Sequence, residues 1–279
     1  MISTSKVSKR ARPLLGTIVE IGVQDTHEEI AQQIISDAFA QIERIQRLMS
    51  RFDDSSEVTQ VNRLGVNVEL VVSSDLWTVL ELAQDISRRS EGVFSICTEA
   101  DPNGDLLRLL DDGRVLRLKT GLIDLGGIAK GYAVDQAIEF IKGRGTESAY
   151  VNAGGDVRAF GAPYPILVRN PLRPHESVAS LDLFNAAFAT SAAYHQHAEY
   201  NQSGIIVDPR SNKSIPSGAS ASVMASTCVV ADALTKCMLM MEEEVELLLN
   251  QFNACGFLVR GEHLTSFPKT MDVMPNDAN

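Results

Sequence analysis

The run HEEIAQQIISDAFAQIERIQRLMSRF at residues 27–52 is the strongest folding signal in this sequence. Its apolar residues recur every three or four positions, which is the spacing of one face of an α-helix. These residues are Ile30, Ile34, Ile35, Ala38, Phe39, Ile42, Ile45 and Leu48. The spacing predicts a long amphipathic helix.

Helices and strands mix along the rest of the chain. A β-rich segment at residues 16–24 precedes the long helix, and residues 74–90 form a second predicted helix that starts with a Ser-Asp capping signal. Residues 93–123 are rich in turn signals and poor in strands. Further elements are a short helix ending at Gly65, a helix at 133–145, strands within 148–161, 164–171 and 178–191, a strand that becomes a helix near Val230, and a hairpin at 255–267. Because the two kinds of element do not alternate strictly, we expect an α+β fold rather than a doubly wound sheet.

Composition and charge exclude several classes of partner. Of the 279 residues, 44% are hydrophobic and 22% charged, as in ordinary globular proteins. The net charge of −11 argues against a nucleic acid or an anionic membrane as partner. A polyanionic ligand would therefore need a local positive site.

The N-terminal segment and the cysteines indicate a cytoplasmic protein. Residues 1–13 are basic, lack the apolar run of a secretory signal, and are expected to be disordered. No stretch approaches the roughly 18 consecutive apolar residues of a membrane span. The four cysteines, which are Cys97, Cys228, Cys237 and Cys255, show no metal-binding spacing and are expected to be reduced core thiols.

The stretch DLGGIAKGYAVD at residues 124–135 places a lysine among small residues, with an aspartate at each end. Glycines let a backbone approach a ligand closely, and Lys130 supplies a point charge suited to phosphate oxygens. The helix that follows has N-terminal amides that favour anions. The alternative is a structural turn in which Lys130 pairs with Asp124 or Asp135. The order of a P-loop motif is absent.

Two other stretches allow a structural and a functional interpretation. In VNAGGDVRAFG, the pair Gly154-Gly155 after a strand is typical of a hairpin or bulge. In VVADALTK, Asp232 and Thr235 fall in the first turn of a predicted helix, where a hard cation would find oxygen ligands. A carboxylate at that place also fits a partner of the helix dipole.

Taken together and in order, the motifs of this chain closely resemble those of the ApbE family of FAD:protein FMN transferases. The segments are LLGTIVEI, MSRFDDSSEVTQVN, EGVFSICT, IDLGGIAKGYAVD, YVNAGGDVRAFG, FATSAAYHQ, IIVDPRSNKSIP and SVMASTCVVADALTK. The resemblance implies an ApbE-like domain over residues 14–268, as one unit or as two closely packed subdomains with the FAD site between them, and a tail at 269–279.

The resemblance implies a reaction and a partner. Members of the family bind FAD with Mg²⁺, cleave its diphosphate and attach FMN to a threonine or serine hydroxyl of a target protein. By this resemblance Lys130 contacts FAD, and Asp124 is the acidic ligand on the adenosine side. Gly127 would offer its carbonyl to the magnesium ion, Asp232 would bind that ion through its carboxylate, and Thr235 stands near the ligand threonine.

The resemblance also assigns the lining of the flavin site. Phe52 matches a position that is commonly tyrosine and lies against the flavin. Leu15 stands where most members have methionine. Val93, Phe94 and Ser95 replace the segment with a Phe-Asp pair that lines the ligand.

Several positions depart from the family pattern. Ile205 stands where the family has a histidine thought to assist proton transfer or to position the flavin, and isoleucine has no acid–base chemistry. His195 and His197 lie nearby in sequence as substitutes or as surface residues. Thr235 comes one position early, and Lys236 occupies the threonine position of the metal-binding helix. That lysine could replace a cation's charge, or its stem could carry the charge away from the site.

These departures leave three functions open. The first is an active, magnesium-dependent FAD:protein FMN transferase with a cytoplasmic acceptor protein. The second is a catalytically impaired FAD-binding protein, which is a flavin carrier or pseudoenzyme. The third is an FAD pyrophosphatase that releases FMN and AMP.

Overall fold

The fold is described by a computed structural model that covers residues 6–25, 27–98, 105–173, 175–192, 206–211, 213–215, 218–241 and 244–268. The helices are α1 (Glu28–Met49), α2 (Glu57–Asn62), α3 (Ser74–Arg89), α4 (Ala129–Gly143), α5 (Cys228–Met240) and α6 (Val245–Gln251). The strands are β1 (Lys6–Leu14), β2 (Thr17–Asp25), β3 (Glu69–Val71), β4 (Leu107–Leu109), β5 (Arg114–Arg117), β6 (Ser148–Ala153), β7 (Asp156–Phe160), β8 (Tyr164–Arg169), β9 (Ser177–Leu183), β10 (Ala186–Ala192), β11 (Val207–Asp208), β12 (Lys213–Ser214), β13 (Ala219–Ala225), β14 (Cys255–Arg260) and β15 (His263–Phe267).

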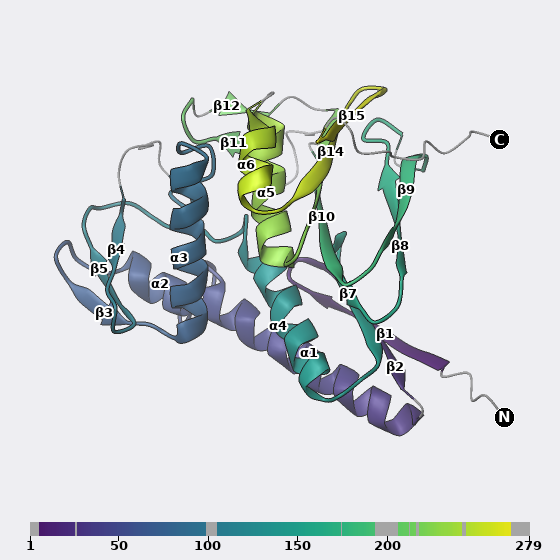
Figure 1. Cartoon of the computed structure of the whole chain (residues 1–279). Coiled ribbons are helices and arrows are strands. Elements are labelled where there is room, and N and C mark those ends of the chain that lie inside the picture. The colour runs from purple at the N-terminus through teal and green to yellow at the C-terminus, as the bar shows by residue number, and fades with distance from the viewer. Residues whose placement is uncertain are drawn as a thin grey trace.

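An antiparallel sheet of eight strands organises the molecule, in the order β1-β2-β6-β7-β10-β13-β14-β15. Helices α1, α4 and α5 pack on one face of it (Figure 1). The three-stranded sheet β3-β5-β4 and helix α3 lie at one side of these helices, and the pair β8-β9 lies at the other side of the large sheet. This mixture of helices and antiparallel strands confirms the predicted α+β class.

The long helix forms where the apolar spacing predicts it. Most of the predicted residues are buried in α1, but Ile30, in its first turn, is half exposed. Helix α3 begins as predicted, because the Ser73 hydroxyl accepts a hydrogen bond from the Leu76 amide and so caps the first turn. The first strand and the closing hairpin are also confirmed, as β2 and as β14-β15.

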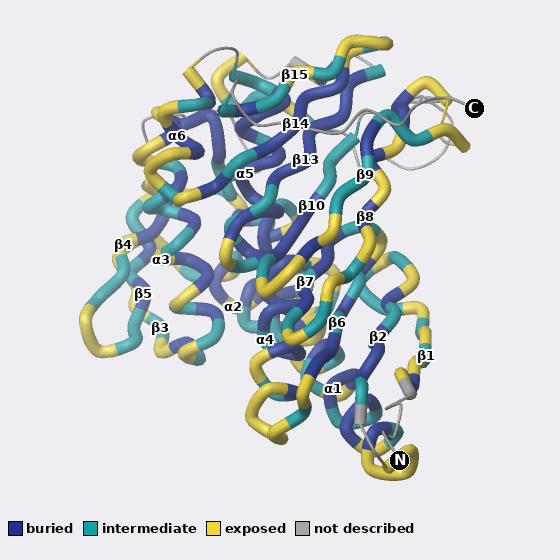
Figure 2. Tube along the Cα trace, turned by 45° about the vertical axis from the view of Figure 1, so that its right-hand side comes forward, coloured by how far each residue is buried: buried dark blue, intermediate teal, exposed yellow. Residues whose placement is uncertain are grey.

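The central strands of the large sheet have an apolar cluster on each face, because their side chains alternate between the two faces and both faces are covered. On β7, Val157 and Ala159 face an apolar cluster covered by β8 and β9. Asp156 and Arg158 alternate with them along the strand and contact α4 on the opposite face. Figure 2 shows the buried residues along the central strands and the helices that cover them.

Two expectations need correction. Residues 6–13 were expected to be disordered, but they lie in β1, which pairs with β2 along its whole length. The physical reason is that β2 offers a long edge whose backbone groups β1 satisfies. The helix expected at 133–145 begins earlier, at Ala129, so Lys130 lies in its first turn.

The structure shows the state of the cysteines and the character of the helices in the described residues. All four cysteines are free thiols, but Cys97 and Cys255 are only partly buried. Within the described part of the chain, no helix combines the length and the apolar character needed to cross a membrane. The predicted tail at 269–279 lies outside the described residues.

Candidate active site

Lys130 forms an ion pair with Asp156, the aspartate of the VNAGGDVRAFG motif. Asp156 is the first residue of β7 and is 1% exposed, whereas the Lys130 side chain keeps 29% of its surface exposed. Neither partner expected from the sequence pairs with this lysine. Asp124 binds Arg51 at 3.1 Å between Oδ2 and Nε, and Asp135 binds Arg158 at 2.9 Å between Oδ1 and Nη1. The alternation of β7 turns Asp156 toward α4, and this makes it the partner.

Asp232 and Lys236 form a second ion pair, one turn apart on α5. The Lys236 ammonium contacts the Oδ1 atom of Asp232 and also donates to its backbone carbonyl oxygen at 2.8 Å. The other carboxylate oxygen, Oδ2, accepts the backbone amide of Gly131 at 3.1 Å. Both side-chain oxygens of Asp232, which is 1% exposed, are therefore engaged within the protein.

The N-termini of α4 and α5 hold each other at this place. Asp232 of α5 accepts the Gly131 amide of α4, and Asp135 of α4 accepts the amides of Cys228 and Val229 at 2.9 and 2.8 Å. Each helix start thus receives a carboxylate from the other helix, which suits its dipole. The approach requires glycine at 131, because a Cβ atom there would lie 2.4 Å from the carbonyl oxygen of Cys228. We call this junction, with Lys130, Asp156, Asp232 and Lys236, the charged cluster.

Gly127 brings the turn before α4 against the charged cluster. A Cβ atom at Gly127 would lie 3.8 Å from Cε of Lys236 and 3.5 Å from the ring of Phe94. The Lys236 stem therefore runs between α5 and this turn. The ring of Phe94, which is 3% exposed, packs against the same turn.

Thr235 does not face the turn at Gly127. Its hydroxyl donates to the carbonyl oxygen of Asp232 at 2.6 Å and lies 2.6 Å from the hydroxyl of Ser191 on β10. Asp232 and Thr235 were expected in the first turn of their helix, but α5 begins at Cys228, so both lie deeper in it.

The charged cluster perturbs Lys130. Burial lowers the pKa of the Lys130 ammonium, the carboxylate of Asp232 opposes this shift, and the ammonium of Lys236 adds to it. The two lysines and the aspartates Asp156 and Asp232 balance in formal charge. Each ammonium carries three N–H donors. The cluster can therefore offer hydrogen bonds to an anion without giving up its ion pairs.

The expected adenosine-side residue Asp124 and flavin-side residue Phe52 both contact Arg51. The Arg51 guanidinium pairs with Asp124 and lies 4.5 Å from the ring centre of Phe52. Phe52 is 79% exposed, so its ring is free to contact a ligand. The other oxygen of Asp124 accepts the amide of Gly126 at 2.9 Å, which shapes the turn before Gly127.

The remaining lining residues lie in different surroundings. Leu15 occupies the turn between β1 and β2 with a positive φ of 55°, and its amide donates to Gln46 at 2.6 Å. Val93 is part of the core at 1% exposure. Ser95 accepts the amide of Cys97 at 3.0 Å. Ile205, His195 and His197 lie outside the described residues.

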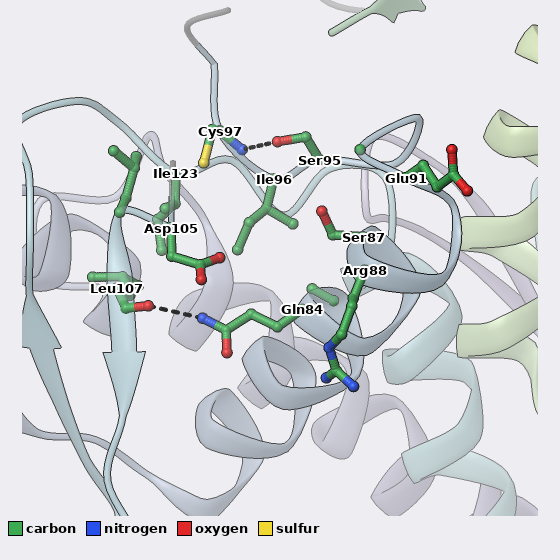
Figure 3. A pocket seen from close by; sticks show the side chains of 13 residues that line it. Gln84, Ser87, Arg88, Glu91, Ser95, Ile96, Cys97, Asp105, Leu107 and Ile123 are labelled. Carbon is green, nitrogen blue, oxygen red and sulfur yellow. Dashed lines mark hydrogen bonds between the residues drawn. The ribbon is translucent and has the colours of Figure 1, made fainter. Parts of the chain in front are cut away.

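Ser95 also lines a cavity of about 740 Å³ between α3 and the segments at 95–97 and 105–107 (Figure 3). Gln84, Ser87 and Arg88 line its α3 side, and Gln84 donates to the carbonyl oxygen of Leu107 at 2.9 Å. Asp105 stands on the opposite wall. The cavity is polar in its lining and is large enough for part of a small ligand.

The predicted magnesium ligands do not fit a magnesium ion in this arrangement. The Lys236 ammonium lies on the Oδ1 atom of Asp232 and its charge would repel a divalent ion there, Thr235 turns toward β10, and the Lys236 stem lies against Gly127. Among the described residues, no three His, Cys, Asp or Glu side chains gather closely enough to hold a metal ion. A cation at Asp232 is present already, and it is an ammonium.

Sequence reasoning missed two residues of this region. Asp156 belongs to a quoted motif, and strand alternation after Gly154-Gly155 would have turned it toward the helices. Arg51 stands directly before Phe52, and nothing in its spacing indicates that it pairs with Asp124.

The Gly131, Cys228 and Val229 amides of this junction already bind carboxylates, so the groups it offers to an anion are the ammonium groups of Lys130 and Lys236. Comparison with known proteins identifies the family. The sequence profile of the ApbE family matches residues 15–101 and 98–257. The chain belongs to the ApbE family, which confirms the resemblance seen in its motifs.

Curated relatives share this assignment at low identity. An FAD:protein FMN transferase of Vibrio cholerae is 24% identical over 258 residues, which cover 78% of this chain and 76% of the relative. An FAD:protein FMN transferase of Haemophilus influenzae is 26% identical over 272 residues, with 82% and 76% covered.

Solved structures match the fold. The flavin transferase ApbE from Vibrio cholerae superimposes with a TM-score of 0.78 and 20% identity, covering 94% of this chain and 97% of that chain. The ApbE protein from Thermotoga maritima matches with a TM-score of 0.79 and 24% identity, covering 93% and 96%. At these identities the likeness establishes the fold.

Proposed function

We propose that this protein is an FAD:protein FMN transferase, which moves FMN from FAD to a serine or threonine hydroxyl of an acceptor protein. Membership of the ApbE family and the names of the curated relatives support the reaction. The observation that carries the proposal is the charged cluster, in which Lys130 and Lys236 stand where the N-termini of α4 and α5 meet. The cluster is neutral in formal charge, but in a chain of net charge −11 it supplies the ammonium N–H donors that a diphosphate needs.

The proposed transfer balances as follows. The acceptor hydroxyl oxygen bonds to the phosphorus of the FMN half, and the bond from that phosphorus to the bridging oxygen breaks. AMP leaves with the bridging oxygen, and the hydroxyl proton passes to water. Ammonium groups of Lys130 and Lys236 would hydrogen-bond the phosphate oxygens and stabilise their charge in the transition state.

Other residues would position the two halves of FAD. By the family resemblance we assign Phe52 to the flavin and Asp124 to the adenosine side, and the exposed ring of Phe52 supports the first assignment. Gly127 would admit the diphosphate to the charged cluster. Leu15, Ser95 and Ile205 complete the proposed lining, and the buried Val93 and Phe94 would support it from the core side.

The resemblance also predicts a magnesium ion, held by Gly127, Asp232 and Thr235. The described residues do not fit that ion at Asp232, so we propose the transfer without a metal on this carboxylate. A cytoplasmic acceptor remains part of the proposal, supported by the composition and the free thiols.

The test is incubation of the purified protein with FAD in the presence of a soluble cell extract as the source of acceptors. We expect AMP release, followed by chromatography, together with a flavin-fluorescent protein band that survives denaturation. The double variant with Lys130→Ala and Asp156→Asn serves as the negative control, because it removes the ammonium without leaving Asp156 as an unpaired buried charge.

Each alternative has its own signature in the same experiment. FMN and AMP in equal amounts without a fluorescent band would identify an FAD pyrophosphatase. Tight FAD binding without AMP release would identify a flavin carrier, the alternative that the Ile205 departure favours.

A further inference from the structure

The charged cluster contains the ammonium group of Lys236, at a position where the family pattern of the metal-binding helix has threonine. Lys236 places its ammonium on two oxygens of Asp232, one from the carboxylate and one from the backbone carbonyl. Carboxylate and carbonyl oxygens are the ligands that a hard divalent cation prefers. The ammonium therefore uses the same oxygens that a metal ion would need.

The path of the side chain strengthens this point. Lys236 runs past Gly127, with Cε 3.8 Å from where a Cβ atom would stand, so it lies between Asp232 and the turn that would face a diphosphate. Its side chain is 16% exposed and that of Asp232 is 1% exposed. A divalent ion on these two oxygens of Asp232 would lie directly beside the Lys236 ammonium, and the two positive charges would repel each other strongly at that distance.

The Oδ2 atom of Asp232 and the hydroxyl of Thr235 also have hydrogen-bond partners within the protein. The amide of Gly131 takes the second carboxylate oxygen of Asp232, and Thr235 points to Ser191. Two of the three ammonium donors of Lys236 are used on Asp232, which leaves one for a ligand.

We infer that Lys236 is the fixed cation of this site, which contacts the diphosphate of FAD in place of a divalent metal on Asp232. The inference rests on the proposed function for the identity of the ligand. Its consequence is that FAD binding does not depend on a divalent ion at this carboxylate. The ammonium acts by charge and hydrogen bonding and transfers no proton.

Two measurements on the full chain test this inference without following turnover. The first is the dissociation constant of FAD, from flavin fluorescence, with Mg²⁺ and with EDTA. We expect the wild-type values to agree within about twofold. The Lys236→Thr variant should bind FAD about ten- to a hundredfold more weakly in EDTA, which is the usual worth of a charged hydrogen bond, and Mg²⁺ should recover part of the loss.

The second measurement is Mn²⁺ binding in the absence of FAD, followed by electron paramagnetic resonance. We expect no tight site in the wild type and a new site in Lys236→Thr. Lys142→Thr, which removes an exposed lysine of α4 that pairs with Glu139, should behave like the wild type in both measurements. Lys236→Met, which keeps the length of the stem, replaces Lys236→Thr if that variant does not fold by circular dichroism.

Specific results would overturn the inference. One is a tight Mn²⁺ site in the wild type that Lys236→Thr leaves unchanged. Another is an equal loss of FAD affinity in EDTA for the wild type and for Lys236→Thr. If the wild type bound no FAD under any condition, the proposed function would fail, and the Mn²⁺ titration would still decide whether Lys236 blocks a metal.

Discussion

At the scale of single residues, the pair of Lys130 and Asp156 shows how a motif acquires its chemistry. The lysine comes from the first turn of α4 and the aspartate from the start of β7. Asp156 is 1% exposed, so its charge depends on the lysine for compensation. The same lysine is the proposed contact of the FAD diphosphate, which gives it a structural and a binding role together.

These two roles can be separated by substitution. Lys130→Ala should weaken FAD binding by about 1.5–3 kcal/mol, the usual worth of a charge-assisted contact. It should also destabilise the fold, because Asp156 is left buried without a partner. The double variant with Lys130→Ala and Asp156→Asn should recover stability but not FAD affinity. Flavin fluorescence and urea unfolding measure the two effects, and an unchanged dissociation constant would make Lys130 purely structural.

At the scale of elements, α4 and α5 position the site by capping each other. Asp135 takes the first two amides of α5, and Asp232 takes the Gly131 amide of α4. Arg158 of β7 holds the Asp135 carboxylate from the sheet side at 2.9 Å. The junction is therefore fixed by three elements, and it holds both Lys130, in the first turn of α4, and Asp232, the partner of Lys236.

Removing one of these caps tests the junction. Asp135→Ala should lower the free energy of unfolding by about 3–5 kcal/mol, because two buried amides lose their acceptor and Arg158 keeps only Glu139 as its partner. Asp135→Asn keeps the shape and should cost less. The measurement is the urea unfolding midpoint, and equal midpoints for the wild type and Asp135→Ala would show that the caps contribute little.

At the scale of the whole molecule, a polar contact at Asp75 joins α3 to α1 and α4. Asp75 of α3 accepts hydrogen bonds from Arg44 of α1 at 2.7 Å and from Tyr132 of α4 at 2.9 Å. Burial raises the pKa of the Asp75 carboxyl, but these two hydrogen bonds outweigh it and hold the pKa below its usual value. Ionised Asp75 therefore stabilises the packing of α3 against α1 and α4.

This contact predicts part of the acid sensitivity of the fold. A carboxyl whose pKa is lower in the folded state stabilises fully above its unfolded pKa, near 3.9, and loses that contribution as the pH falls through its folded pKa. Asp75→Asn should thus lower stability at neutral pH and flatten the decline below about pH 4. Unfolding curves at several pH values measure this, and parallel pH profiles for both proteins would contradict it.

The sequence by itself determined the features that depend on local spacing. The apolar period fixes α1, the Ser73 cap fixes the start of α3, and strand alternation fixes the closing hairpin. The order of the motifs also identified the ApbE family and pointed to Lys130, Asp232 and Lys236 as residues of interest. These signals are local because backbone periods and capping groups act within a few residues of each other.

Only the tertiary structure decided the partners. Gly131 and Asp232 stand 101 positions apart, and Asp135 and Cys228 stand 93 apart, so no spacing rule could pair them. Lys130 was expected to pair with Asp124 or Asp135, but it pairs with Asp156 of the sheet. Asp124 and Asp135 pair with arginines instead. The physical reason is that a buried charge pairs with whichever opposite charge the packing brings into contact, and packing is set by the whole fold.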